Sequence, residues 1–129
     1  MRSEYRIVKV DDKNLPKLKD AIKRMNLETN AHRLRNSDIG SGSKYKVHKA
    51  IGGYLAYHRG KVVGWGAHFE KDCEAHVFTH RLHRRQGIGT KIVERFKKDY
   101  PYLLFCPWHR RVQGFFNKRG VNYSYAYLP

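Results

Sequence analysis

The sequence of 129 residues predicts one α/β domain, residues 1–129, built on a mixed β-sheet. Segments that alternate apolar and polar residues, as strands do, are interleaved with segments whose apolar residues recur at helical spacing. Hydrophobic residues make up 40% of the chain and aromatic residues 13%, which is enough for one buried core. The predicted order is strand, helix, a short second helix, three strands, helix, strand, helix and strand.

The first third of the chain predicts one strand and two helices. Residues 4–10 alternate and are rich in β-branched residues, which indicates a first strand. Apolar residues then recur at helical spacing from Leu15 to Met25, which predicts a helix with one buried stripe. Residues 28–36 are polar and are interpreted as a second, short helix. Residues 37–43 (SDIGSGS) have the composition of a loop.

The middle third predicts a hairpin followed by another strand. Residues 53–69 form two strand-like runs around the turn Arg59-Gly60. Gly64 and Gly66 in the second run indicate a bulge or the close approach of another group. Residues 74–80 predict the next strand of the sheet.

The last third alternates helices and strands. Pro101 is expected to end a helix that runs to about Tyr100, and the continuous apolar run 102–106 predicts a short buried strand. Residues 110–119 predict a last helix with Gly120 as its C-terminal cap, and residues 121–128 alternate and are expected to close the sheet.

The stretch His83-Arg-Arg-Gln-Gly-Ile-Gly-Thr90 joins the strand at 74–80 to a helix whose apolar face begins at Ile88. The first turn of a helix has unpaired N–H groups and the positive end of the helix dipole. Gly87 and Gly89 would let a ligand approach this backbone closely. With Arg84, Arg85 and Lys91 beside it, the turn can hold a phosphate group. An ordinary helix N-terminus with basic residues near it and no ligand has the same pattern.

Two phosphate-binding fingerprints are excluded at this turn. A dinucleotide-binding loop needs a third glycine where this chain has Ile92, and the Gly-Lys-Ser/Thr of a P-loop is absent. Arg84-x-x-Gly87-x-Gly89 instead resembles the pyrophosphate loop of the Gcn5-related N-acetyltransferases, the GNAT superfamily. Residues 114–121 (GFFNKRGV) resemble that family's aromatic-aromatic-x-Lys-x-Gly element, and the order of strands and helices agrees along nearly the whole chain.

The resemblance implies a mostly antiparallel sheet with splayed central strands and helices on both faces. Acetyl-CoA, the implied co-substrate, would lie between the strands at 74–80 and 102–106, with its pantetheine arm along Val77, Phe78 and Thr79. Its pyrophosphate would be held by the loop residues Arg84, Arg85, Gln86, Gly87, Ile88, Gly89 and Thr90. The implied activity is the transfer of an acetyl group to an amine acceptor by direct attack on the thioester.

The general base is open among four residues. Many family members have a tyrosine as proton donor where this chain has Phe116; the histone-modifying branch has phenylalanine there and uses a glutamate base on the strand before the loop. Glu74 is one residue away from that glutamate's position, which on a strand changes the face unless a bulge intervenes. The other candidates are His76 and His80 on the same strand and His109 before the last helix, and any one of them could be an ordinary polar side chain.

Metal binding and cysteine chemistry are not expected. His76, His80 and His83 lack cysteine partners and the spacing of a helical zinc motif, so no metal is predicted. Cys106 could carry an acyl group, but a small buried residue at a strand end is the simpler interpretation.

The charge of the chain points to anionic partners. Lys and Arg number 27 against 11 Asp and Glu, a net charge of +16 spread over the whole sequence. The charge favours an acidic or nucleic-acid-associated acceptor and leaves one alternative, a basic GNAT-fold protein directed to DNA or RNA. Phe116 leaves another, a non-catalytic CoA-binding relative. No signal peptide or apolar run of membrane-spanning length is present, so we expect a cytoplasmic monomer or homodimer with no membrane partner.

Overall fold

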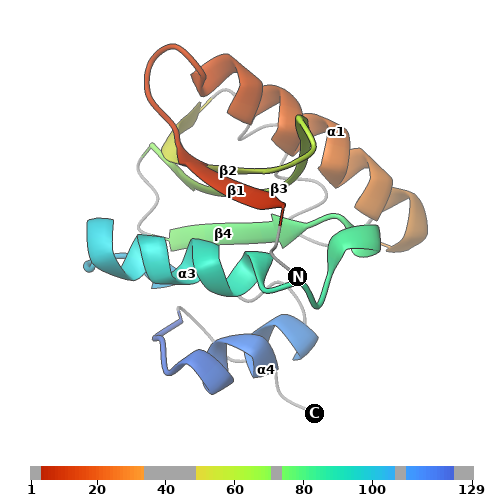
Figure 1. Cartoon of the computed structure of the whole chain (residues 1–129). Helices are drawn as coiled ribbons and strands as arrows, with labels where there is room; N and C mark the ends of the chain where they lie inside the picture. Colours follow the sequence, from red (N-terminus) through yellow and green to blue (C-terminus); the bar gives the residue numbers. More distant parts are fainter. Residues whose placement is uncertain (1–3, 34–48, 71–73, 107–109, 124–129) are drawn as a thin grey trace.

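The computed structural model describes residues 4–33, 49–70, 74–106 and 110–123. These residues form five strands, three α-helices and one 3-10 turn (Figure 1). In chain order they are β1 (Tyr5–Lys9), α1 (Leu15–Arg33), β2 (Ala50–His58), β3 (Lys61–Phe69), β4 (Glu74–Thr79), η2 (Arg81–His83), α3 (Ile88–Asp99), β5 (Leu104–Phe105) and α4 (Arg110–Arg119). No helix in these ranges is long and apolar enough to cross a membrane.

The sheet has the order β1-β2-β3-β4-β5, and every neighbouring pair is antiparallel except β4 and β5. The parallel pair β4–β5 is short: Glu74 pairs with Leu104 and Ala75 with Phe105, and the Cys106 amide donates to the carbonyl of Ala75 at 2.9 Å. From Val77 onward, β4 has no strand partner on this side within the described ranges. The two strands therefore separate toward the loop that follows β4.

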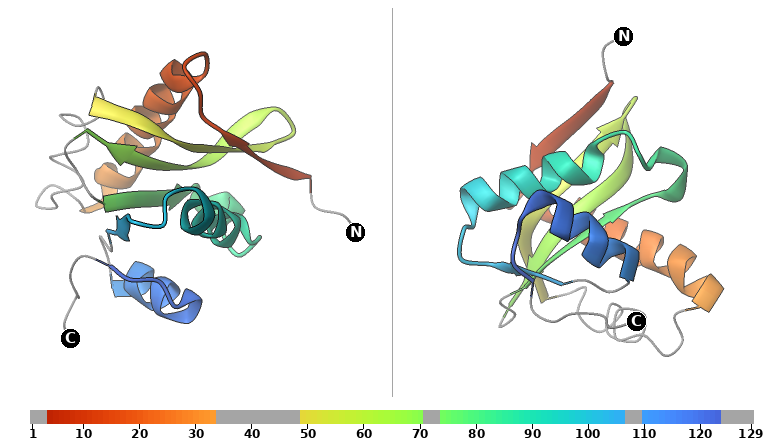
Figure 2. Two further views of the ribbon diagram at one scale, coloured as in Figure 1. Left: turned by 90° about the vertical axis from the view of Figure 1, so that its left-hand side faces the viewer. Right: turned by 90° about the horizontal axis from the view of Figure 1, so that it is seen from below.

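Helices cover both faces of the sheet (Figures 1 and 2). The apolar stripe of α1, from Leu18 to Met25, packs with Trp65 and Phe78 on one face. On the other face α3 and α4 lie beside each other, and Phe116 of α4 belongs to the same buried cluster as α3 and Phe105. The expected fold class is confirmed: a mixed, mostly antiparallel sheet with helices on both faces.

The apolar face of α3 determines how closely this helix approaches the sheet. Ile88, Ile92, Val93 and Phe96 are all 1% exposed or less. A Cβ on Gly66 of β3 would lie 2.5 Å from Ile92 Cγ2 and 2.7 Å from Phe96 Cε2. Glycine at this position thus permits the close packing that the sequence indicated.

The C-terminal end of α3 is tied to the sheet by polar contacts. The Tyr54 hydroxyl of β2 donates to Asp99 Oδ2 at 2.5 Å, and Lys9 of β1 lies 3.6 Å from the same oxygen. Burial, together with the hydrogen bond to Asp99, raises the pKa of Tyr54, and this bond lowers the pKa of Asp99. These contacts hold the end of α3 that is remote from the glycine turn.

Three segment predictions need correction. The short second helix at 28–36 is wrong in its start, because α1 runs without a break to Arg33; residues 26–33 contain no proline or glycine to end it. The strand at 102–106 is reduced to Leu104–Phe105. Val121 and Asn122 are not strand residues, and Tyr123 makes only an isolated bridge with Phe105. The predicted loop at 37–43 and the remainder of 121–128 lie outside the described residues.

Candidate active site

A cavity of about 770 Å³ lies where β4 and β5 separate. Its walls come from the second half of β4, the following turn, the first turn of α3 and one side of α4. The lining residues are Val77, Phe78, Thr79, His83, Arg84, Arg85, Gly87, Ile88, Gly89, Thr90, Arg111, Val112, Gly114, Phe115, Phe116, Lys118 and Arg119. The structure thus places every residue predicted to hold the co-substrate in this wall except Gln86.

The turn between β4 and α3 presents backbone N–H groups to the cavity. Gly87 caps α3 with φ of +84°, a left-handed conformation that favours glycine. The amide of Lys91 makes the first helical bond, to the carbonyl of Gly87, at 3.0 Å. The amides of Ile88, Gly89 and Thr90 precede that bond, so they have no intrahelical acceptor. The first turn of α3 contains no acidic residue that could neutralise the helix dipole.

The charge around the cavity is of one sign. Five lining residues are Arg or Lys, and none is Asp or Glu. Arg84 is held in the turn by a hydrogen bond from Nε to the carbonyl of Thr79, at 2.8 Å, and its guanidinium lies over the Phe78 ring. Positive side chains gathered at a positive helix end repel each other, so the site is electrostatically suited to a group with several negative charges.

The rest of the cavity wall is apolar. Val77, Ile88 and Phe116 are buried residues of the core, and Phe115 packs against them. A Cβ on Gly89 would lie 3.1 Å from Phe115 Cζ, so this glycine lets α4 approach the start of α3. The cavity therefore combines a cationic rim with an apolar wall, as an amphipathic anionic ligand requires.

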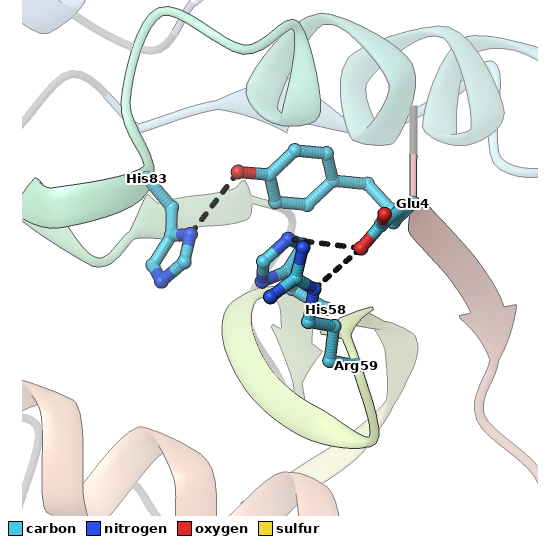
Figure 3. A network of polar contacts seen from close by, with 5 residues as sticks. Glu4, His58, Arg59 and His83 are labelled. Carbon is cyan, nitrogen blue, oxygen red and sulfur yellow. Dashed lines mark hydrogen bonds and ion pairs between the residues drawn. The ribbon is translucent and has the colours of Figure 1, made fainter. Parts of the chain in front are cut away.

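A histidine network adjoins the cavity at His83 (Figure 3). His83 Nδ1 is 3.1 Å from the hydroxyl of Tyr5, whose ring stacks on His58 at 4.5 Å. Glu4 pairs with His58 and with Arg59 at the β2–β3 turn. Burial, with the charges of His58 and His80 when these are protonated, lowers the pKa of His83.

Sequence reasoning missed part of the lining. His83 was weighed only as a metal ligand, and the cations Arg111, Lys118 and Arg119 of α4 were assigned no role. The basic residues around the aromatic pair of α4 were the available signal. Among the described residues, no three His, Cys, Asp or Glu side chains are grouped to hold a metal ion.

The predicted base candidates do not meet in the cavity wall, and His80, which follows β4, does not line it. Glu74 is the first residue of β4 and pairs with Leu104, at the end where β4 and β5 are still joined. His76 is 5% exposed, does not line the cavity, and meets Phe69 edge-on at 5.4 Å on the α1 side of the sheet. His109 lies outside the described residues. Cys106 is buried, in agreement with a structural role.

Several solved structures with this fold are described as acetyltransferases. The ribosomal-protein-alanine N-acetyltransferase from Brucella melitensis biovar Abortus 2308 has a TM-score of 0.60 and 12% identity, covering 99% of this chain and 98% of that one. A predicted acetyltransferase from Clostridium acetobutylicum, solved with acetyl-CoA, has a TM-score of 0.56 and 14% identity, covering 97% and 94%. An aminoglycoside acetyltransferase from an uncultured soil metagenomic sample has a TM-score of 0.56 and 16% identity, covering 97% and 96%.

Sequence comparison shows the family directly. No curated protein matches the sequence significantly. The profile described as "Acetyltransferase (GNAT) domain" matches residues 50–121, more than half of the chain, from β2 through the turn to the end of α4. The matched region contains the whole cavity wall. The chain belongs to the GNAT family of acetyltransferases.

Proposed function

We propose that this chain is an acyl-CoA-dependent N-acetyltransferase. The observation that carries the proposal is the cavity at the β4–β5 separation, which joins a cationic helix start to an apolar wall. Its volume of about 770 Å³ is within the usual range for small-molecule sites, roughly 300–1,000 Å³. The amides of α3, with Arg84 and Arg85 of the turn, would hold the phosphates of acetyl-CoA, and the apolar wall would contact its pantetheine arm.

The reaction is the direct attack of an amine on the thioester. A bond forms between the amine nitrogen and the acetyl carbon, and the carbon–sulfur bond breaks. An acceptor that arrives as an ammonium loses two protons from nitrogen in all: the base takes one, and the other balances the proton that the leaving thiolate takes up. A lysine-like amine has a pKa of about 10.4 and arrives protonated, so a base is required. The candidates for this base are Glu74, His76, His80 and His109; the first three do not line the cavity. The measurement is kcat for the variants Glu74→Gln, His76→Gln, His80→Gln and His109→Gln: a fall in one variant that the others do not share would identify the base, and an unchanged kcat in all four would refute these candidates.

The binding step is tested at Gly87 by calorimetric titration with acetyl-CoA. The wild type should bind with a dissociation constant of micromolar order, whereas Gly87→Asp should not bind, because its carboxylate stands where the phosphates are held. Gly87→Asn is the matched control: it has the same size and the same left-handed backbone conformation without the charge.

Three outcomes would contradict the proposal. Acetyl-CoA that fails to bind the folded wild type removes the co-substrate. Equal binding by Gly87→Asp and Gly87→Asn shows that the ligand lies elsewhere. If binding is found without turnover over a broad set of amine acceptors, the non-catalytic relative becomes the better interpretation.

A further inference from the structure

Arg119 of α4 and Thr90 of α3 are joined by a pair of hydrogen bonds beside the glycine turn at the start of α3. Arg119 Nε donates to Thr90 Oγ1 at 2.9 Å, and Nη2 donates to the same oxygen at 2.5 Å. Both residues line the cavity. They are 29 positions apart in the sequence, so only the packing of α4 beside α3 brings them together.

Thr90 and Arg119 both keep hydrogen-bond donors that their contact with each other does not use. A threonine hydroxyl has one proton to donate and two lone pairs that accept. The Nε–H and one Nη2–H of Arg119 both donate to Thr90 Oγ1, so the hydroxyl accepts on the side that faces α4. The proton of this hydroxyl has no acceptor within the described ranges. Arg119 also donates from Nη1 to the carbonyl of Phe115 at 3.3 Å. Three of its five N–H groups are thereby used, and two remain.

The guanidinium of Arg119 is held in a position that is electrostatically unfavourable when no anion is bound. Its carbon lies 4.0 Å from the centre of the Phe115 ring, and Phe115 in turn packs against Gly89. A cation held at a helix N-terminus opposes the helix dipole. An anion in the cavity would reverse the sign of this interaction, since it attracts both the helix start and Arg119.

We propose that Arg119 and Thr90 form one phosphate-binding unit for the acyl donor, in which Arg119 also positions Thr90 as a hydrogen-bond donor. The inference rests on the proposed function and adds to it a ligand from α4. The free proton of Thr90 and the two remaining N–H groups of Arg119 are directed to one phosphate group. Because the unit joins two helices, phosphate binding also ties α4 to the start of α3.

The test compares ligands with and without phosphate. The variants are Arg119→Lys, Thr90→Val, their combination, and Thr90→Ser. The ligands are acetyl-CoA, inorganic pyrophosphate and S-acetylpantetheine, which has no phosphate. Lysine keeps the charge of Arg119 but cannot make two parallel hydrogen bonds to one oxygen. Circular dichroism and melting temperature, measured without ligand, report on folding.

Arg119→Lys and Thr90→Val should each weaken acetyl-CoA binding by roughly 10- to 100-fold, as expected for a lost hydrogen bond to a charged group. The combined variant should be little worse than either single one, because the two residues act together. Thr90→Ser should bind nearly as the wild type does. The affinity for S-acetylpantetheine should not change in any variant.

The proposal is overturned if Arg119→Lys binds acetyl-CoA as tightly as the wild type, or if S-acetylpantetheine binding falls by the same factor, which would indicate a purely structural role. Failure of the proposed function has a different signature: the wild type would not bind acetyl-CoA at all. In that case the titration with pyrophosphate tests the Arg119–Thr90 unit by itself. If the two residues form an anion site, the wild type must bind pyrophosphate more tightly than Arg119→Lys and Thr90→Val do.

Discussion

At the scale of single residues, Phe116 sets the chemistry that the site can use. Its side chain is fully buried, lines the cavity, and packs against Phe105 and Phe115. A phenylalanine has no proton to give to the leaving thiolate. A thiol has a pKa of about 8.5, so a thiolate leaves near neutral pH without full protonation. The proposed reaction therefore depends on a base for the amine more than on an acid for the sulfur.

We predict that His83 makes acetyl-CoA binding depend on pH. Its lowered pKa means that the folded protein holds this proton less tightly than the unfolded chain, so without ligand stability falls as the pH drops below the ordinary value of 6.5. A bound anion reverses this trend by stabilising the charged ring. Acetyl-CoA binding should then take up a proton at His83 and tighten at lower pH, by at most about tenfold for each pKa unit regained.

Calorimetry in two buffers of different ionisation enthalpy measures this uptake between pH 5.5 and 8. The variant His83→Gln should lose the His83 contribution, and the difference from the wild type isolates it, because the phosphates of the donor titrate equally in both experiments. The charged and titratable neighbours His58, His80, Glu4 and Arg59 are retained in the variant. Identical proton uptake by the two proteins would show that His83 does not sense the ligand.

At the scale of elements, α3 connects the core to the site. Its buried face packs on β3 and β4, its C-terminal end is held by Tyr54 through Asp99, and its free N-terminal amides face the cavity. The same helix therefore supplies both core stability and the anion site. A change in how closely α3 sits on the sheet should affect both.

Gly66→Ala tests how much stability depends on the close approach of α3 to the sheet. The added Cβ would lie within 2.7 Å of both Ile92 and Phe96, so we expect a loss of about 1–3 kcal/mol in the free energy of unfolding. Gly114→Ala is the control, because its Cβ meets nothing within 4 Å and alanine favours a helix by about 0.5–1 kcal/mol. Urea unfolding measures both variants without ligand. A Gly66→Ala protein as stable as the wild type would mean that α3 can shift at no cost.

At the scale of the whole molecule, the net charge of +16 acts on every charged partner. It attracts the anionic donor and an acidic or nucleic-acid-associated acceptor, and it repels acceptors that carry several positive charges. Screening by salt weakens both effects, because the Debye length falls from about 10 Å at 0.1 M to about 3 Å at 1 M. The charge of the acceptor can therefore be inferred from the sign of the salt response.

We predict that kcat/KM falls with added salt for amine acceptors beside acidic groups, and rises or stays constant for polycationic amines such as aminoglycosides. The measurement is thiol release at saturating acetyl-CoA over 0.05–0.5 M salt, with a neutral amine as control for effects on the chemical step. The opposite order, with aminoglycosides favoured at low salt, would reject an anionic acceptor. Steeply salt-dependent binding of DNA or RNA would favour the nucleic-acid-directed alternative.

Local patterns in the sequence were sufficient for most elements and for one wall of the site. The periodicity of α3, the run of α4 from Arg110 to Arg119 and the glycine turn at Gly87 all depend on residues close together in the chain. The same reasoning was wrong between residues 28 and 36, where polar composition does not distinguish a new helix from the continuation of α1.

Sequence alone was sufficient for the family, for the glycine turn that we propose as the phosphate site and for the two helix faces that build the core, because these follow from short-range spacing and backbone preference. Only the tertiary structure decided which side chains complete the site. Tyr5 meets His83 across 78 positions, and Arg119 meets Thr90 across 29. Such contacts are set by how helices and strands pack in space, and no local pattern of residues specifies them.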